Sequence, residues 1–336
     1  MRSVSAAPYV IMQTFFNSVS AVLVILLMTA TGYLLGRIGY IRAEHKAMIT
    51  KLAVNVALPC MCLSSLTRNF TRASLVEAGT LLLVSALVQL VGVLISTAIA
   101  RLLRLPHNRR GVFVAMGAFS NSTFIGLPMC VELFGDAAVP YVMCYYLVNT
   151  TLFQLLGAGF IESSGRPKGE KTGFFKRLSS LLVRPPMLAI LVALTLIWFE
   201  LPLPRVLQSY TQYIGDMVSP LGLLYTGYII YEHGLSNLRL EKGFPALLAL
   251  RFIAAPALCL LFCALLGVEG LARGVFTVEA AMPTMTQTVV LSTMLGADED
   301  YAAQGAALSA YCKSLLDAYE ARLMQVDAAQ GIKEEI

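Results

Sequence analysis

A polar break inside a long apolar run is the stretch of this sequence best suited to hold a small polar solute. The run extends from Gly111 to Asp136 and contains Ser120-Asn121-Ser122-Thr123 followed by Gly126-Leu127-Pro128. Pro128 removes one backbone donor, and Gly126 lets another backbone approach closely. Irregular backbone at membrane depth is tolerated where it faces protein or a wet cavity, and discontinuous helices there bind solutes. We therefore expect Asn121, Gly126 and Pro128 to line a binding site; a simple kink in a packed helix is the alternative.

A second break of the same kind lies in the apolar run from Gly274 to Leu295. Hydroxyl and amide groups can hydrogen-bond a carboxylate without trapping it through a permanent charge. The expected additional site residues are Pro283, Thr284, Thr286 and Gln287 from this run, with Asn55 and Asn149 from two other apolar runs. The alternative is that these polar side chains only join helices by hydrogen bonds.

One carboxylic acid, Glu279, lies inside the second run, one helical turn before Pro283. An ionisable side chain within the membrane is costly and usually belongs to an ion or proton pathway. Glu279 is therefore the residue expected to carry a proton, if the chain couples a solute to protons; Glu132, Asp216 and Glu77 are weaker candidates. A neutral glutamic acid hydrogen-bonded to unwound backbone is the structural alternative.

The composition indicates a membrane protein. Hydrophobic residues make up 57% of the chain and charged residues 13%, whereas soluble domains carry about 25% charged residues. The net charge of +5 comes from basic residues in the loops between apolar runs, so no nucleic-acid partner is expected. The seven cysteines form no CxxC pair and the three histidines lie near loops, so we expect no metal and no cofactor.

The apolar runs predict an all-α polytopic membrane protein, because each is long enough to cross most of a bilayer as a helix. The predicted spans are Phe15–Leu35, Leu52–Leu66, Ser74–Ile99, Gly111–Asp136, Ala137–Ile161, Pro185–Phe199, Val206–Tyr231, Pro245–Leu266 and Gly274–Leu295. A tenth run begins at Ala302 and reaches Leu316, but Lys313 interrupts it and further charges follow. A charged residue at a helix centre costs about 2.5 to 3.5 kcal/mol on insertion scales, so this span is expected to be incomplete, short or sheltered.

Two halves of the chain resemble each other. The tetrapeptide from Arg110 to Phe113 recurs from Arg273 to Phe276, and Pro59 has a counterpart in Pro220 at nearly the same offset. Two halves with an odd number of spans are inverted relative to each other, which makes their broken helices cross near the midplane. The predicted domains are an inverted repeat in residues 1–163, a basic linker in 164–182, a second repeat in 183–316 and a polar tail in 317–336.

Charge asymmetry predicts the orientation. Basic residues concentrate in the loops after the first, third, fifth and seventh runs, and few occur on the opposite side. The positive-inside rule then places the long midpoint loop in the cytoplasm and the N-terminus outside, in a plasma (inner) membrane.

Five short segments, in the same order, resemble the auxin efflux carrier family. The segment FSNSTFIGLPMCVELFG and the span that follows it resemble the family's fourth and fifth spans, and the remaining matches are NVALPCMCLSSL, SPLGLLYTG and AAMPTMTQTVVLSTMLG. The resemblance covers most of residues 15 to 310 and implies the inverted ten-span fold, with the tail as a departure. It also implies a secondary carrier of small organic anions such as mono- or dicarboxylates, working by alternating access in a lipid bilayer. A homodimer is left open.

Other classes of function have less support. No phosphate-binding GxxxxGK[ST] stretch, HExxH pair or GxSxG elbow occurs, so neither an ATP-driven pump nor an enzyme is expected. A membrane sensor that binds a carboxylate ligand without transporting it is the alternative that we keep. The sequence does not indicate which carboxylate is bound, in which direction it moves, or which ion drives it.

Overall fold

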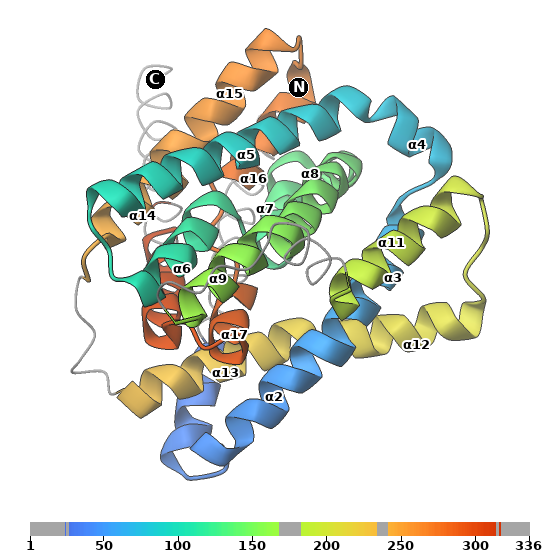
Figure 1. The fold of residues 1–336 in the computed structure, drawn as a ribbon. Helices are drawn as coiled ribbons and strands as arrows, with labels where there is room; N and C mark the ends of the chain where they lie inside the picture. The colour runs from blue at the N-terminus through green and yellow to red at the C-terminus, as the bar shows by residue number, and fades with distance from the viewer. Residues whose placement is uncertain (1–23, 25–26, 168–182, 234–240, 314–315, 317–336) are drawn as a thin grey trace, which may run out of the picture.

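A computed structural model describes residues 24, 27–167, 183–233, 241–313 and 316 of the chain (Figure 1). Within these residues the regular structure is helical, apart from one isolated antiparallel bridge between Ser120 and Thr284. The all-α expectation is therefore confirmed for the described chain. The start of the first predicted span, most of the linker predicted at 164–182 and the tail at 317–336 lie outside the described residues.

Several helices run into one another through π-turns, so that they form longer rods. The elements of the first half are α2 (Lys46–Leu52), η2 (Ala53–Ala57), α3 (Leu58–Asn69), α4 (Arg72–Glu77), α5 (Gly79–Leu102), α6 (His107–Ala118), η3 (Ser122–Gly126), α7 (Leu127–Phe134), α8 (Val139–Leu152), η5 (Phe153–Gly157) and α9 (Ala158–Gly165). Those of the second half are α11 (Pro185–Trp198), α12 (Arg205–Gly215), α13 (Val218–His233), α14 (Phe244–Ala249), η7 (Leu250–Ala254), α15 (Ala255–Leu265), α16 (Gly270–Ala280) and α17 (Gln287–Met294). Residues 27–37 and 299–313 are also helical.

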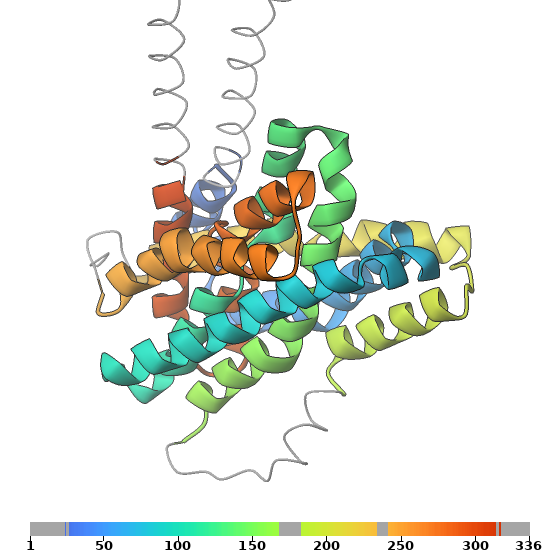
Figure 2. The same cartoon turned by 90° about the horizontal axis from the view of Figure 1, so that it is seen from above.

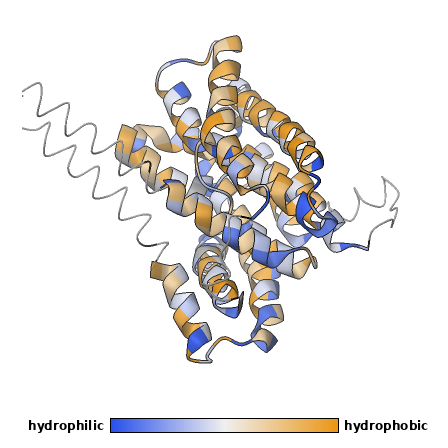
Figure 3. Cartoon of the chain, turned by 90° about the vertical axis from the view of Figure 1, so that its left-hand side faces the viewer, coloured by the Kyte–Doolittle hydropathy of each residue, from blue (hydrophilic) through white to orange (hydrophobic). Residues whose placement is uncertain are grey.

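Four of these rods are long and apolar enough to cross a membrane. They are Ala43–Asn69, Gly79–Leu102, Asp136–Gly165 and Phe244–Leu265, and Pro185–Trp198 is a shorter apolar helix. Large apolar side chains such as Leu94, Val192 and Leu261 are exposed on them, and Figure 3 shows that hydrophobic residues make up much of the helices. So much exposed apolar surface fits a lipid environment. The chain is therefore a multi-pass membrane protein.

Prolines are accommodated by π-turns in three of the rods. Pro59, Pro128 and Pro256 each lie in the first turn after a π-turn, in α3, α7 and α15 respectively. Proline cannot donate to the carbonyl four residues earlier, and in each case that carbonyl lies in the wider π-turn. A proline inside an apolar run such as Leu52–Leu66 is expected to interrupt the span, but Pro59 does not, and the chain is helical from Ala43 to Asn69.

The helices form two groups that pack against each other. In one group α3 packs against α11 and α12, with α2 and α13 beside them. In the other, α5 packs against α6, α8 and α15, α6 against α9, and α15 against α16. Figures 1 and 2 show α11 and α12 on one side of the molecule and α14 and α15 on the other. The helix α17 contacts α2 and α13 of the first group and α9 of the second, so it lies where the two groups meet.

Candidate functional site

Two unwound segments cross inside the molecule and pair through their backbones. The first, residues 119–121, separates α6 from η3 and α7, and the second, residues 281–286, separates α16 from α17. The N–H of Asn121 donates to the carbonyl of Pro283 over 2.9 Å, and the N–H of Met285 donates to the carbonyl of Phe119 over 3.4 Å. Each break thus supplies partners for backbone groups that the other leaves without a helical bond. The first break lies upstream of Pro128. The helix continues through the proline, because the carbonyl that Pro128 leaves without its usual donor lies in the wider π-turn η3.

Two polar side chains satisfy the bridge residues from neighbouring helices. Asn149 of α8 donates its Nδ2 to the carbonyl of Ser120 over 2.8 Å, and its Oδ1 accepts from the Ser120 N–H over 3.3 Å. In the second break the N–H of Thr284 donates to the Ser309 hydroxyl over 3.2 Å, and the two hydroxyls lie 3.1 Å apart. Asn149 therefore lies at the crossing, but its amide holds backbone. Sequence reasoning missed Ser309, whose position inside the irregular tenth run was the available signal.

A buried arginine, Arg251 in η7, fastens the carbonyl ends of both broken helices. It is 1% exposed. Its guanidinium donates to the carbonyls of Met282 (2.7 and 3.0 Å), Ala280 (2.8 Å) and Gly117 (3.3 Å). Gly117 lies at the end of α6 and Ala280 ends α16, so these are carbonyls that the breaks deprive of helical partners. Sequence reasoning missed Arg251, although a lone arginine inside the apolar run Pro245–Leu266 was a signal.

Glu279 lies against the turn that leads into α7. Its side chain is fully buried, and Oε1 accepts from the Cys130 thiol over 3.6 Å. A Cβ atom placed on Gly126 would lie 2.4 Å from that same Oε1, closer than non-bonded atoms can approach. The structure therefore brings together Gly126 and Glu279 from the two broken helices, and it requires glycine at position 126.

Some hydrogen-bonding atoms at the crossing have no partner among the described residues. They are Asn121 Nδ2, Glu279 Oε2, Gln287 Oε1 and Thr288 Oγ1, all of them buried. Buried polar atoms are nearly always hydrogen-bonded, so a group of unpartnered ones points to a missing ligand or water. Asn121 comes from the first break, and Gln287 and Thr288 begin α17 beyond the second.

The remaining predicted residues are placed as follows. Pro283 and Thr284 are buried in the second unwound segment, and Thr286 is partly exposed at its end. Pro128 lies in the first turn of α7. Asn55 lies exposed on η2, and no hydrogen bond joins it to either unwound segment within the described chain.

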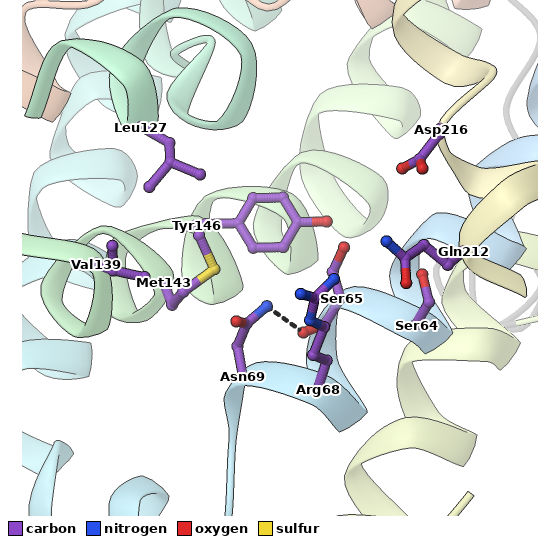
Figure 4. Close-up of a pocket in the computed structure, with 10 residues that line it drawn as sticks. All are labelled: Ser64, Ser65, Arg68, Asn69, Leu127, Val139, Met143, Tyr146, Gln212 and Asp216. Carbon is purple, nitrogen blue, oxygen red and sulfur yellow. Dashed lines mark hydrogen bonds between the residues drawn. The ribbon is translucent and has the colours of Figure 1, made fainter. Parts of the chain in front are cut away.

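A cavity of about 300 Å³ lies between α3, α7, α8 and α12 (Figure 4). Its lining consists of Ser64, Ser65, Arg68, Asn69, Leu127, Val139, Met143, Tyr146, Gln212 and Asp216. Leu127 lies directly between Gly126 and Pro128 in the chain, which connects the cavity to the first broken helix. The buried Tyr146 hydroxyl has no hydrogen-bond partner in the described structure, and it points toward the polar side chains of α3 and α12 (Figure 4). The cavity can therefore accept a small polar solute.

Ion pairs join the loops that carry most of the basic residues. Lys46 of α2 lies 2.5 Å from Glu232 of α13 and 2.6 Å from Glu299, at the start of helix 299–313. Arg109 of α6 lies 2.7 Å from both Glu241 and Asp298. The Lys46–Glu232 pair lies within the first helix group, and the Lys46–Glu299 pair connects α2 to helix 299–313 on this side of the molecule.

A helical membrane chain with two broken helices that cross at a buried polar centre has the architecture of a membrane carrier. The chain belongs to the family described as Membrane transport protein, whose model matches residues 17–316. This confirms the resemblance to the auxin efflux carriers.

Two archaeal relatives agree with this assignment. An uncharacterized transporter of Methanocaldococcus jannaschii is 24% identical over 286 residues, covering 82% of this chain and 89% of its own. An uncharacterized transporter of Methanothermobacter thermautotrophicus is 25% identical over 293 residues, covering 85% of this chain and 91% of its own.

Proposed function

We propose that this membrane transport protein is a secondary carrier of small organic anions, such as mono- or dicarboxylates. The observation that carries the proposal is the crossing itself, where two unwound segments pair and leave buried polar atoms of Asn121 and Gln287 without partners. The N-terminal ends of helices favour anions through their free N–H groups and dipole. At this crossing η3 begins beside the unpartnered Asn121 amide nitrogen and α17 begins beside the unpartnered Thr288 hydroxyl, so a carboxylate would meet donors from both breaks.

The hydrogen bonds at the breaks support an arrangement of two inverted five-helix repeats. Ser120 is held by Asn149 from the helix that follows the first break, and Thr284 is held by Ser309 from the helix that follows the second. The repeated tetrapeptide lies within α6 in one half and within α16 in the other. Each half would then supply one broken helix and the residue that supports it.

Alternating access follows from the asymmetry between the two sides of the molecule. On one side the Lys46–Glu299 pair joins the two helix groups, since helix 299–313 packs on α6 through Gly305 and Met116, and the Arg109 pairs lie on the same side. The cavity between α3 and α7 lies between the same groups and includes exposed Arg68 and Asp216. With the basic loops in the cytoplasm, as the positive-inside rule predicts, the cavity would open outward, and breaking the ion pairs would open the other side. This orientation places the N-terminus outside in the plasma (inner) membrane.

Glu279 is the residue that we assign to proton coupling. A buried carboxyl group with one unpartnered oxygen can take up a proton where the charged form is poorly supported. Its contact with Gly126 ties it to the first break, while its own helix leads into the second. A change in its charge would therefore be felt at both halves of the substrate site.

Counterflow in proteoliposomes tests the proposal. The purified protein, reconstituted with unlabelled lactate or succinate inside, should take up the same labelled anion transiently. Binding of the anion without exchange would favour the alternative, a membrane sensor. If the protein neither bound nor exchanged any carboxylate or indole acid, the proposal would be overturned. The oligomeric state of the same preparation decides whether the carrier is a homodimer.

A further inference from the structure

The crossing contains a buried charge that no sequence motif assigns. Arg251 is the largest fully buried side chain of the described structure, and its guanidinium hydrogen-bonds to backbone carbonyls. No carboxylate of the described residues lies within ion-pair distance of it. A buried charge without an ion-pair partner is costly in free energy. A neutral donor could hydrogen-bond the three carbonyls at a lower cost, which suggests that the charge of Arg251 has a further role.

The helix ends explain how this charge is held. The C-terminal end of a helix carries roughly half a negative charge, and Arg251 binds carbonyls at the ends of both α6 and α16. These two ends stabilise the guanidinium without a neutralising carboxylate. The positive charge is consequently held at the point where the two breaks meet.

Glu279 provides the opposing charge when it is ionised, and its protonation removes that charge. It directly precedes Ala280, whose carbonyl Arg251 binds, and it lies against Gly126, at the turn that opens into α7. An anion approaching the start of η3 and α7 therefore meets the chain's own carboxylate as well as the attraction of Arg251.

Other titratable groups face this pair from neighbouring elements. Tyr145 of α8, Cys130 of α7 and Cys259 of α15 surround it, and Lys313 of helix 299–313 acts on Cys130. Phenol and thiol groups are neutral near pH 7. Lys313 has the same sign as Arg251, so it adds to the attraction for anions.

We propose that Arg251 and Glu279 form an opposed charge pair that determines the carrier's preference for anionic substrates. Arg251 is the fixed cation that attracts the anion, and the ionised carboxylate of Glu279 opposes that attraction. This inference rests on the proposed function and adds the residues that determine specificity. It requires changes of opposite sign from the two residues. Removing the negative charge strengthens anion binding, and removing the positive charge weakens it.

The test compares Glu279→Gln, Arg251→Gln and Arg251→Lys in proteoliposomes, with whichever of lactate and succinate the wild type exchanges as the probe. We expect Glu279→Gln to lower KM about tenfold and Arg251→Gln to raise it about tenfold, a change of about 1.4 kcal/mol in each case. Arg251→Lys keeps the charge and should stay closer to the wild type in KM, even if its maximal rate falls with the lost carbonyl bonds.

The uncharged amide of the same acid serves as the control ligand. Its inhibition constant should be the same in all variants, and failure of the amide to compete in any of them would also show that charge is required. Shifts of KM in the same direction for both residues, or equal shifts for acid and amide, would overturn the inference. If Arg251→Gln does not fold, Glu279→Gln decides alone, since an unchanged or raised KM contradicts the charge pair. A wild-type protein that exchanges no anion counts against the proposed function instead.

Discussion

The backbone N–H of Asn121 donates to the carbonyl of Pro283 over 2.9 Å, across 162 residues of chain. This bond fastens one broken helix to the other, while the Asn121 side-chain amide nitrogen stays buried without a partner among the described residues. The same residue thus has a structural role through its backbone and a free binding group on its side chain. Substitutions of the side chain can separate these roles.

Asn121→Ala should reduce transport at least tenfold with little loss of stability, because its amide nitrogen makes no hydrogen bond that the substitution removes. Exchange rate and thermal unfolding are measured on the same detergent-purified protein. A variant that exchanges anions at the wild-type rate would remove Asn121 from the site.

Asn149→Ala should behave in the opposite way. Its amide satisfies both backbone groups of Ser120, and leaving buried polar groups unpaired costs about 1 to 3 kcal/mol each. We expect a clearly lower unfolding temperature than that of Asn121→Ala. Equal stability of the two variants would contradict the hydrogen bonds described for α8.

Gly126→Ala should destabilise the protein by about 1 to 3 kcal/mol, since the new methyl group would overlap the Glu279 carboxylate. Gly222→Ala in α13 is the matched control, because nothing lies within 4 Å of a Cβ atom there. That control should be neutral or stabilising, as alanine is the better helix former. Thermal unfolding of both variants checks the prediction, and a stable Gly126→Ala protein would show that Glu279 does not press on this turn.

Lys46→Met should open the side of the molecule that carries the ion pairs, because it removes both links from α2 to Glu232 and Glu299. Labelling of a Thr293→Cys reporter on α17, in a background without other cysteines, should become faster with an impermeant thiol reagent applied from that side. The control is Glu44→Gln, whose exposed carboxylate pairs only with Arg42 and His45 in the described structure. Identical labelling rates in both variants would mean that Lys46 does not hold the closed state.

Glu279→Gln tests proton coupling, because glutamine mimics the protonated acid permanently. The variant should still exchange labelled for unlabelled anion, but it should no longer accumulate the anion in response to a pH gradient. Uptake is followed with and without the gradient in parallel liposomes. Accumulation with the pH dependence of the wild type would exclude Glu279 from coupling.

The sequence predicted where the two breaks lie and which residues they contain, but it did not predict their backbone conformation. Glycine, proline and small polar residues inside apolar runs located both crossing segments, since each feature weakens a helix locally. The first break was expected to include Pro128, but the chain unwinds at residues 119–121 and the π-turn η3 accommodates the proline. Local sequence does not distinguish these two ways of accommodating a missing backbone donor.

Arg251 and Ser309 were missed for a different reason. Both act on backbone atoms of segments far away in the chain, and only the fold brings them to those carbonyls and amides. The amide of Asn149 likewise looked like a free ligand, although the structure shows it bonded to Ser120. The spacing of residues along one helix does not reveal which distant side chains will hydrogen-bond the backbone groups of an unwound segment.

The most direct test of the central claim is counterflow of a labelled small carboxylate by the wild type and by Asn121→Ala, at matched protein density. The account predicts transient accumulation above equilibrium by the wild type and at least a tenfold slower approach by the variant, with both proteins equally stable. Equal counterflow by the two proteins, or none by the wild type with any carboxylate, would contradict it.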